Sequence, residues 1–166
     1  MRFEIRHELD APLDTVELAT LSPDLGRRLA ERCKAFESIE TVEHVLERGT
    51  LRRVLRFQAN APLPALARYA PAREAMCWCE RFEYRLADHA SSWCVELPRE
   101  EWRRYFSSEG TYRLERLEDG RTARIVEGTL TVAAGVLAPV IERLALVEVR
   151  RTYDAEAETL RELSSL

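Results

Sequence analysis

Residues 135–163 read GVLAPVIERLALVEVRRTYDAEAETLREL, and this last stretch decides the fold. It holds no glycine after Gly135, and its one proline, Pro139, falls in the first turn, where proline is tolerated. Apolar residues recur near the 3.6-residue period of a helix, at Leu137, Ile141, Leu144, Val149, Tyr153, Ala157, Leu160 and Leu163. A helix of this length spans roughly 40 Å. It therefore needs a broad apolar surface, which we expect to be an antiparallel sheet.

The overall composition excludes several classes of protein. The 166 residues are 46% hydrophobic and 33% charged, which is typical of one globular domain spanning residues 1–166. The net charge is −4 and no basic patch is visible, so we expect no nucleic-acid partner. No apolar run approaches the length of a membrane-spanning helix, so we expect no integral membrane segment. The chain opens directly in a strand pattern rather than a signal peptide, and its four cysteines are expected to be reduced in the cytoplasm.

The N-terminal third predicts one strand followed by two short helices. Residues 2–9 alternate strictly, with one face formed by Phe3, Ile5, His7 and Leu9. Asp14 is expected to cap the first helix. Ser22-Pro23-Asp24 is a strong start signal for the second helix, which is expected to run to about Phe36.

Three hairpins follow. They are 39–48 with 51–58 around Gly49-Thr50, 76–87 with 91–97 around His89-Ala90, and 105–117 with 121–132 around Glu118-Asp119-Gly120. In the first hairpin, a two-residue turn places Glu47 opposite Arg52. The segment 59–73 holds three prolines and is expected to be a surface loop with one helical turn at 66–69.

The third hairpin has a register fixed by its turn. If Gly120 takes the left-handed position, Tyr112 pairs with Val126 and Gly110 with Gly128. Facing glycines leave a trough in which a helix backbone can come close.

Four stretches of the chain carry a resemblance to a known family. They are RHELDAP at 6–12, EGTYRL at 109–114, EGTLTV at 127–132 and the terminal helix beginning near Ile141-Glu142. With this order of elements, the chain resembles the START-like, or Bet v 1-like (SRPBCC), helix-grip superfamily, and within it the uncharacterised bacterial START-like proteins. The resemblance implies an α+β fold in which a curved seven-stranded antiparallel sheet wraps around a long C-terminal helix, with two short helices between the first two strands. Members commonly hold an apolar ligand between sheet and helix.

The inner faces of the predicted strands and helix supply a candidate ligand-binding cavity. Its lining is predicted to be His44, Arg53, Leu55, Phe57, Trp78, Glu80, Phe82, Tyr84, Trp93, Tyr112, Leu144 and Tyr153. We expect a carrier or sensor that binds a hydrophobic or lipid-like small molecule without catalysis and without a cofactor. One or two polar groups, such as Tyr84, His44 or Arg53, would orient the ligand.

Two alternatives come from other functional classes. In the first, the chain is a cyclase- or hydrolase-like enzyme that uses His7, His44 or Glu80 as acid and base, since burial raises the pKa of a carboxyl group and lowers that of a histidine. In the second, it is a protein-interaction module with a filled cavity and an exposed apolar patch at the proline-rich loop. The sequence contains none of the phosphate-loop, dinucleotide, serine-hydrolase or zinc-protease motifs.

The spacing of the cysteines bears on whether they could bind a metal. Cys77 and Cys79 share one strand face, roughly 6–7 Å apart. The predicted register places Cys94 opposite Arg85, away from that pair, and a zinc-type C-x₂-C turn is absent. We therefore expect no metal site.

Overall fold

The computed structural model describes residues 1–61 and 76–165. The strands are β1 (Arg2–Leu9), β2 (Phe36–Glu47), β3 (Thr50–Ala59), β4 (Cys77–Arg85), β5 (Ala90–Glu96), β6 (Phe106–Arg116) and β7 (Thr122–Val132). The helices are α1 (Leu13–Thr20), α2 (Leu25–Arg32) and α3 (Ala138–Ser164), with short 3-10 helices η2 (Glu100–Arg104) and η3 (Gly135–Leu137). Most of the predicted loop 59–73, including its helical turn, lies outside the described residues.

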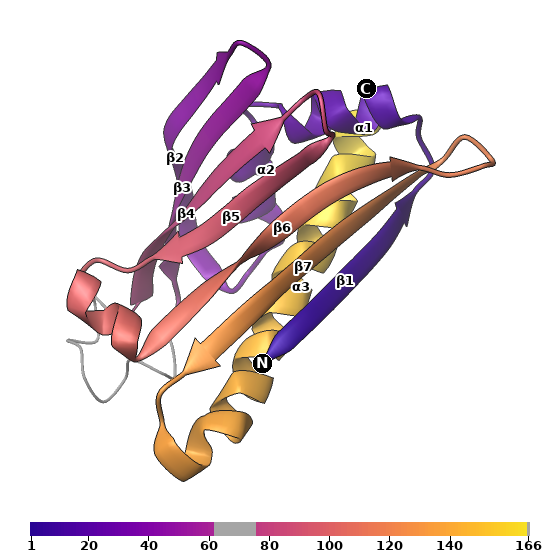
Figure 1. The fold of residues 1–166 in the computed structure, drawn as a ribbon. Coiled ribbons are helices and arrows are strands. Elements are labelled where there is room, and N and C mark those ends of the chain that lie inside the picture. The colour runs from indigo at the N-terminus through magenta and orange to yellow at the C-terminus, as the bar shows by residue number, and fades with distance from the viewer. Residues whose placement is uncertain (62–75, 166) are drawn as a thin grey trace.

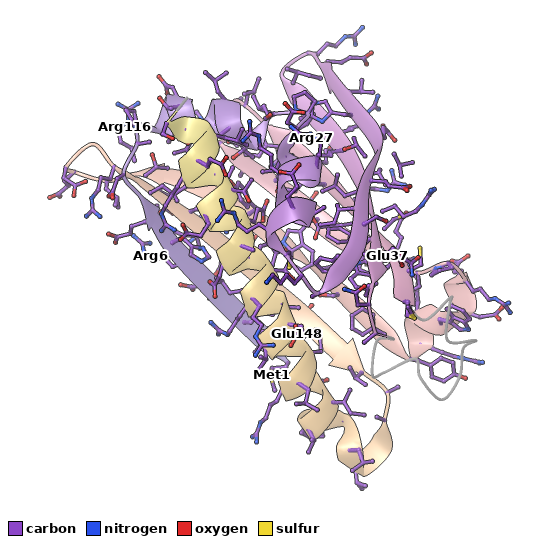
Figure 2. The ribbon with its side chains drawn as sticks, turned by 180° about the vertical axis from the view of Figure 1, so that it is seen from behind. Met1, Arg6, Arg27, Glu37, Arg116 and Glu148 are labelled. Carbon is purple, nitrogen blue, oxygen red and sulfur yellow. The ribbon has the colours of Figure 1, made fainter. Side chains whose placement is uncertain are left out.

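The seven strands form one antiparallel sheet in the order β1-β7-β6-β5-β4-β3-β2. The sheet curves around α3, which crosses its concave face, while α1 and α2 cover the same face near the C-terminal end of α3 (Figure 1). Seen from behind, α3 lies in front of the sheet, and its first turns extend past the end of the strands (Figure 2). The predicted helix-grip arrangement is confirmed.

The two short helices form as expected, but the cap of α1 and the end of α2 differ from the prediction. Pro12, not Asp14, is the N-cap of α1, and its carbonyl accepts hydrogen bonds from the amides of Thr15 and Val16. Asp14 lies in the first turn, where its negative charge interacts favourably with the positive end of the helix dipole. The second helix, α2, ends at Arg32 because the backbone of Cys33 is already extended. Its predicted end at Phe36 was wrong, since that residue begins β2.

The turn between β2 and β3 lies one residue earlier than predicted. Arg48 and Gly49 both have positive φ, at 49° and 77°, as a type I′ turn requires. Glu47 therefore pairs with Thr50 rather than Arg52. Because the pairing shifts by two residues, the side chains stay on their predicted faces.

A bulge between Thr41 and Glu43 is the exception to that rule. It interrupts the alternation of β2, and Val42, which strict alternation from His44 would place on the inner face, is half exposed at this point.

The turn between β4 and β5 is wider than the predicted two residues. It spans 86–89, with His89 in the left-handed region at φ 51°, and Arg85 donates a hydrogen bond to the carboxylate of Asp88 at 2.6 Å. Cys94 consequently pairs with Arg81 and not with Arg85. This shift is also an even number of residues, so Glu80 still shares the inner face with Trp93 and its neighbours.

The β6–β7 hairpin has the predicted register. Gly120 takes φ 85°, Tyr112 pairs with Val126, and Gly110 pairs with Gly128. The glycine trough, however, receives the indole of Trp93 rather than a helix backbone. A Cβ added at Gly110 or Gly128 would lie 2.8 or 2.7 Å from that indole, so only glycine fits beneath it.

The long helix α3 is buried unevenly. Ala157 and Leu160 are fully buried, whereas Leu144 is 57% exposed. No helix among the described residues is long and apolar enough to cross a membrane. The uneven burial of α3 marks the place where a cavity remains.

Candidate functional site

A cavity of about 460 Å³ lies between the inner face of the sheet and the first half of α3. Aromatic rings supply much of its wall: Phe36, Phe57, Trp78, Trp93, Phe106 and Tyr153. Aliphatic side chains complete it, namely Val95, Leu130, Leu144 and Val149. This volume and lining are typical of sites for small organic molecules.

The aromatic wall is held by ring-to-ring contacts. Trp78 stacks on Phe57, with centroids 5.7 Å apart and planes 8° apart, and Phe36 meets both rings edge-on. On the other side, Trp93 and Tyr153 meet edge-to-face at 6.3 Å and join the sheet to α3. Because such pairs add to the stability gained by burial, we expect the wall to be formed without a ligand.

Glu80 is the charged group that the sheet contributes to this cavity. It lies on β4 between Leu55 and Val95 on the adjacent strands. Burial raises the pKa of Glu80 to about 7, the carboxylate of Glu156 adds to the shift, and two neighbouring arginines oppose it. No hydrogen bond from the described residues is among the causes of this shift. The carboxyl group therefore titrates near neutral pH beside an apolar space.

A buried ion pair lies behind the cavity, toward the C-terminal half of α3. Arg124 is fully buried and donates hydrogen bonds to the carboxylate of Glu156 and to the backbone carbonyl of Tyr153. Its guanidinium also lies 5.2 Å from the ring centroids of Tyr112 and Tyr153. Burial opposes the charge on Arg124, but Glu156 and the neighbouring tyrosines outweigh that effect and keep the pKa of the guanidinium above its usual value.

Sequence reasoning missed this pair, although a signal was present. Arg124 alternates with Val126 on the inner face of the predicted strand 121–132. Glu156 follows Tyr153 by three residues and so lies on the same side of the helix.

The family model for proteins of unknown function DUF2505 matches residues 4–163, nearly the whole chain. The chain belongs to the DUF2505 family. None of the curated proteins compared with it matches its sequence.

Solved structures with the same fold are distant in sequence. The chain is similar to TTHA0849 from Thermus thermophilus, with 19% identity, a TM-score of 0.64, and coverage of 99% of this chain and 97% of that one. It is similar to the Zhui aromatase/cyclase from Streptomyces sp. R1128, with 17% identity, a TM-score of 0.66, and coverage of 99% of this chain and 93% of that one. It is also similar to Ara h 8.0201, with 15% identity, a TM-score of 0.62, and coverage of 96% of this chain and 97% of that one. These likenesses establish the START-like, Bet v 1-like fold that the sequence resembled.

In this DUF2505 chain, half of the candidate residues named from the sequence line the cavity. These are Phe57, Trp78, Glu80, Trp93, Leu144 and Tyr153. The structure places the others on the inner face but away from the cavity: His44, Arg53, Leu55, Phe82, Tyr84 and Tyr112. This division follows from the short helices, which cover that part of the sheet.

Contacts with α1 account for several of the residues away from the cavity. Arg53 donates a hydrogen bond to the carbonyl of Thr20 at 2.8 Å. The hydroxyl of Tyr112 lies 3.0 Å from the hydroxyl of Thr20. Tyr84 donates to the carboxylate of Glu17 at 2.7 Å, and burial is the main cause that raises the pKa of this phenol. These polar groups join the sheet to α1 and do not face the cavity.

The three acid–base candidates are not brought together. His7 lies 2.8 Å from the carboxylate of Asp154 and accepts a hydrogen bond from Arg124, and burial lowers its pKa. His44 lies beside Arg53, and burial followed by that positive charge lowers its pKa. Of the three, only Glu80 is among the described residues that line the cavity.

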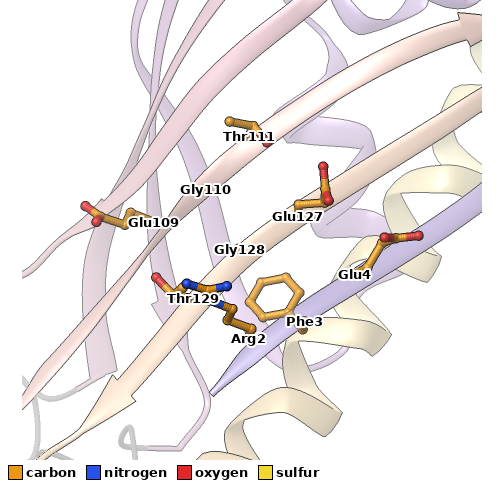
Figure 3. Close-up of a pocket in the computed structure, with 9 residues that line it drawn as sticks. All are labelled: Arg2, Phe3, Glu4, Glu109, Gly110, Thr111, Glu127, Gly128 and Thr129. Atoms are coloured by element: carbon orange, nitrogen blue, oxygen red, sulfur yellow. The ribbon is translucent and has the colours of Figure 1, made fainter.

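A second hollow, of about 700 Å³, lies over β1, β6 and β7 (Figure 3). It is lined mainly by polar and charged side chains around Gly110 and Gly128, including Glu4, Glu109 and Glu127. Phe3 is the one large apolar side chain among the described residues that line it, so it is less suited to burying an apolar molecule than the cavity beside α3.

The cysteines do not form a metal site within the described part of the chain. No group of three or more His, Cys, Asp or Glu side chains there is placed to hold a metal ion. Cys33, Cys77, Cys79 and Cys94 are free thiols, and burial is the main cause that raises the pKa of Cys77 and of Cys94. Thiols of this kind are less reactive than thiolates.

Proposed function

We propose that this protein binds a hydrophobic small molecule in the cavity between the sheet and the first half of α3, as a carrier or sensor without covalent chemistry. The cavity carries this proposal: it holds about 460 Å³ and is walled mainly by aromatic and aliphatic side chains. Binding would gain about 25 cal/mol for each Å² of apolar ligand surface removed from water. The proposal includes the cytoplasmic location that the cysteine content predicts.

The fold supports the binding of an organic molecule, rather than the absence of catalysis, by analogy. One of the solved structures with this fold is named an aromatase/cyclase, which acts on an organic molecule. We take from this that the space between sheet and helix is suited to such molecules in this chain too.

The enzyme alternative is less well supported by the geometry. It needs an acid and a base that reach one substrate, yet His7 and His44 lie away from the cavity that Glu80 lines. The interaction-module alternative expects a filled core, whereas a cavity is present. Among the described residues, exposed apolar side chains gather around η3 and the start of α3. The interaction-module alternative expected such a patch at the proline-rich loop, most of which lies outside the described residues.

Cavity filling tests the proposal directly. Ala145 lines the cavity from α3, so Ala145→Trp would occupy the space with an indole. The matched control is Val147→Trp on the same helix, at a position that is 45% exposed and outside the lining. We expect Ala145→Trp to weaken binding of the neutral probe N-phenyl-1-naphthylamine at least about tenfold, equivalent to roughly 1.4 kcal/mol, with the control unchanged.

Fluorescence titration measures both affinities, and circular dichroism confirms that both variants fold. Native mass spectrometry with denaturing extraction would then identify any co-purified ligand. Equal loss of binding in the two variants would place the probe on the exposed helix surface and overturn the cavity proposal.

A further inference from the structure

The charged side chains that line the cavity from the described part of the chain all have one sign. Glu80 enters it from β4 and Glu148 from α3, and the other polar side chains of the described lining are neutral: Asn60, Ser108, Thr152 and the phenol of Tyr153. No arginine, lysine or histidine is among the described lining residues. A ligand carboxylate in this space would meet the carboxyl groups of Glu80 and Glu148 and no basic side chain from the described lining, although Glu148 is itself paired with the exposed Arg151.

The aromatic wall favours the same sign of ligand charge. Trp78 precedes Glu80 by two residues on the inner face of β4, and Trp93 and Tyr153 line the cavity as well. The faces of such rings attract cations, most strongly when the cation is removed from water. A contact of this kind is present next to Glu80. Phe82 follows Glu80 by two residues on β4, and the guanidinium of Arg53 lies 4.6 Å from the centroid of the Phe82 ring.

Several charged and titratable groups face Glu80 from the surrounding elements. They are Arg53 on β3, Arg124 on β7, and Tyr153 and Glu156 on α3, with Glu148 lining the same cavity. Both arginines are already engaged: Arg53 with the Thr20 carbonyl and the Phe82 ring, and Arg124 with Glu156. Neither lines the cavity, so the carboxyl group of Glu80 is left to meet a ligand.

We propose that the cavity takes an amphiphile with a cationic head, a protonated amine or quaternary ammonium, whose head lies at Glu80 between the aromatic rings and whose tail lies along the apolar wall. This inference rests on the proposed binding function and specifies the class of ligand. A cation there stabilises the ionised carboxylate, offsetting the burial that disfavours it.

Three probes with the same ten-carbon chain separate the charge of the head from the burial of the tail. They are decyltrimethylammonium, decanol and decanoate, measured by isothermal titration calorimetry at pH 8, with the two ionic probes below their micelle concentrations and decanol below its solubility limit. We expect the cation to bind at least about tenfold tighter than decanol, and decanoate to bind weakest. Glu80→Gln should remove the advantage of the cation over decanol. Glu83→Gln, on the exposed face of the same strand, should leave the binding of all three probes unchanged.

The pH dependence gives an independent readout. The charge of decyltrimethylammonium is permanent, so any change in its affinity reports on the protein. Because the pKa of Glu80 is about 7, its ionised fraction rises between pH 6 and pH 8, and the affinity should rise about tenfold over that range. The rise should be absent in Glu80→Gln and with decanol.

The outcomes distinguish this inference from the function on which it rests. If decanol binds as tightly as the cation, or decanoate binds tightest, the cationic class is wrong and the apolar cavity site stands. If none of the three probes binds, both proposals fail.

Discussion

The two halves of α3 carry the same apolar period but differ in what they meet. In the second half, Ala157 and Leu160 are fully buried against the sheet and the short helices. In the first half, Val140 and Leu144 are more than half exposed, and the cavity lies beneath. The difference arises because α1 and α2 fill the concave face at one end only. A repeated apolar stripe thus predicts a helix that packs, but not how closely each turn packs.

The two halves of α3 also differ in whether the charged groups beside them are paired. Buried charge in the second half is paired, with Arg124 bonded to Glu156. At the first half, Glu80 faces a cavity and has no such bond from the described residues. We therefore expect the second half to govern stability and the first half to govern binding.

The largest effect should come from breaking the buried pair. Glu156→Ala leaves the guanidinium of Arg124 buried without its counter-ion, and we expect a loss of about 3–5 kcal/mol in the free energy of unfolding. The matched control is Glu158→Ala on the same turn, whose pair with Arg161 is exposed, so it should cost less than about 1 kcal/mol. Urea denaturation followed by circular dichroism measures both. Similar losses in the two variants would contradict the inference that the buried pair stabilises the second half of α3 more than an exposed pair does.

The next effect compares two leucines on the one helix. Leu160→Ala removes a fully buried side chain and should cost about 2–5 kcal/mol. Leu144→Ala, at a position that is 57% exposed, should stay within about 0.5 kcal/mol of the parent. Thermal and urea unfolding give both values. A large cost at Leu144 would show that the first half is as tightly packed as the second.

A smaller effect concerns Glu80 and pH. Its pKa in the folded chain is about 7, above the unfolded value of 4.5, so the folded state binds the proton more tightly. Its contribution to stability is therefore fully present below about pH 4.5 and is lost as the pH rises through 7. We expect Glu80→Gln to be more stable than the parent at pH 8 by about 1–2 kcal/mol, and to lose that advantage at pH 5. Unfolding curves at the two pH values check this, and an advantage that does not change with pH would contradict it.

Much of the fold was readable because local signals agreed with one another. Gly120 predicted the β6–β7 turn and, through it, the pairing of Gly110 with Gly128. Strict alternation predicted β1 at its observed bounds. The pairings in the other two hairpins were displaced by even numbers of residues, so the inward-facing set survived the errors in register, except at the bulge around Val42.

The candidate site was only partly readable for a reason of geometry. Alternation assigns a side chain to the inner face of a sheet but does not say what covers it. Glu80 and Arg53 lie on that same face, yet α1 binds Arg53 through the Thr20 carbonyl while Glu80 lines the cavity. The pairing of Arg124 with Glu156 joins a strand to a helix 32 residues later in the chain.

The sequence by itself determined the order of elements, the strand faces and the long amphipathic helix, since these depend on periods of two and 3.6 residues and on turn chemistry. Only the tertiary structure decided which inward residues form a packed core, which form a buried ion pair and which line a cavity. Those outcomes depend on where two short helices pack against a curved sheet, and packing joins residues that no local period relates.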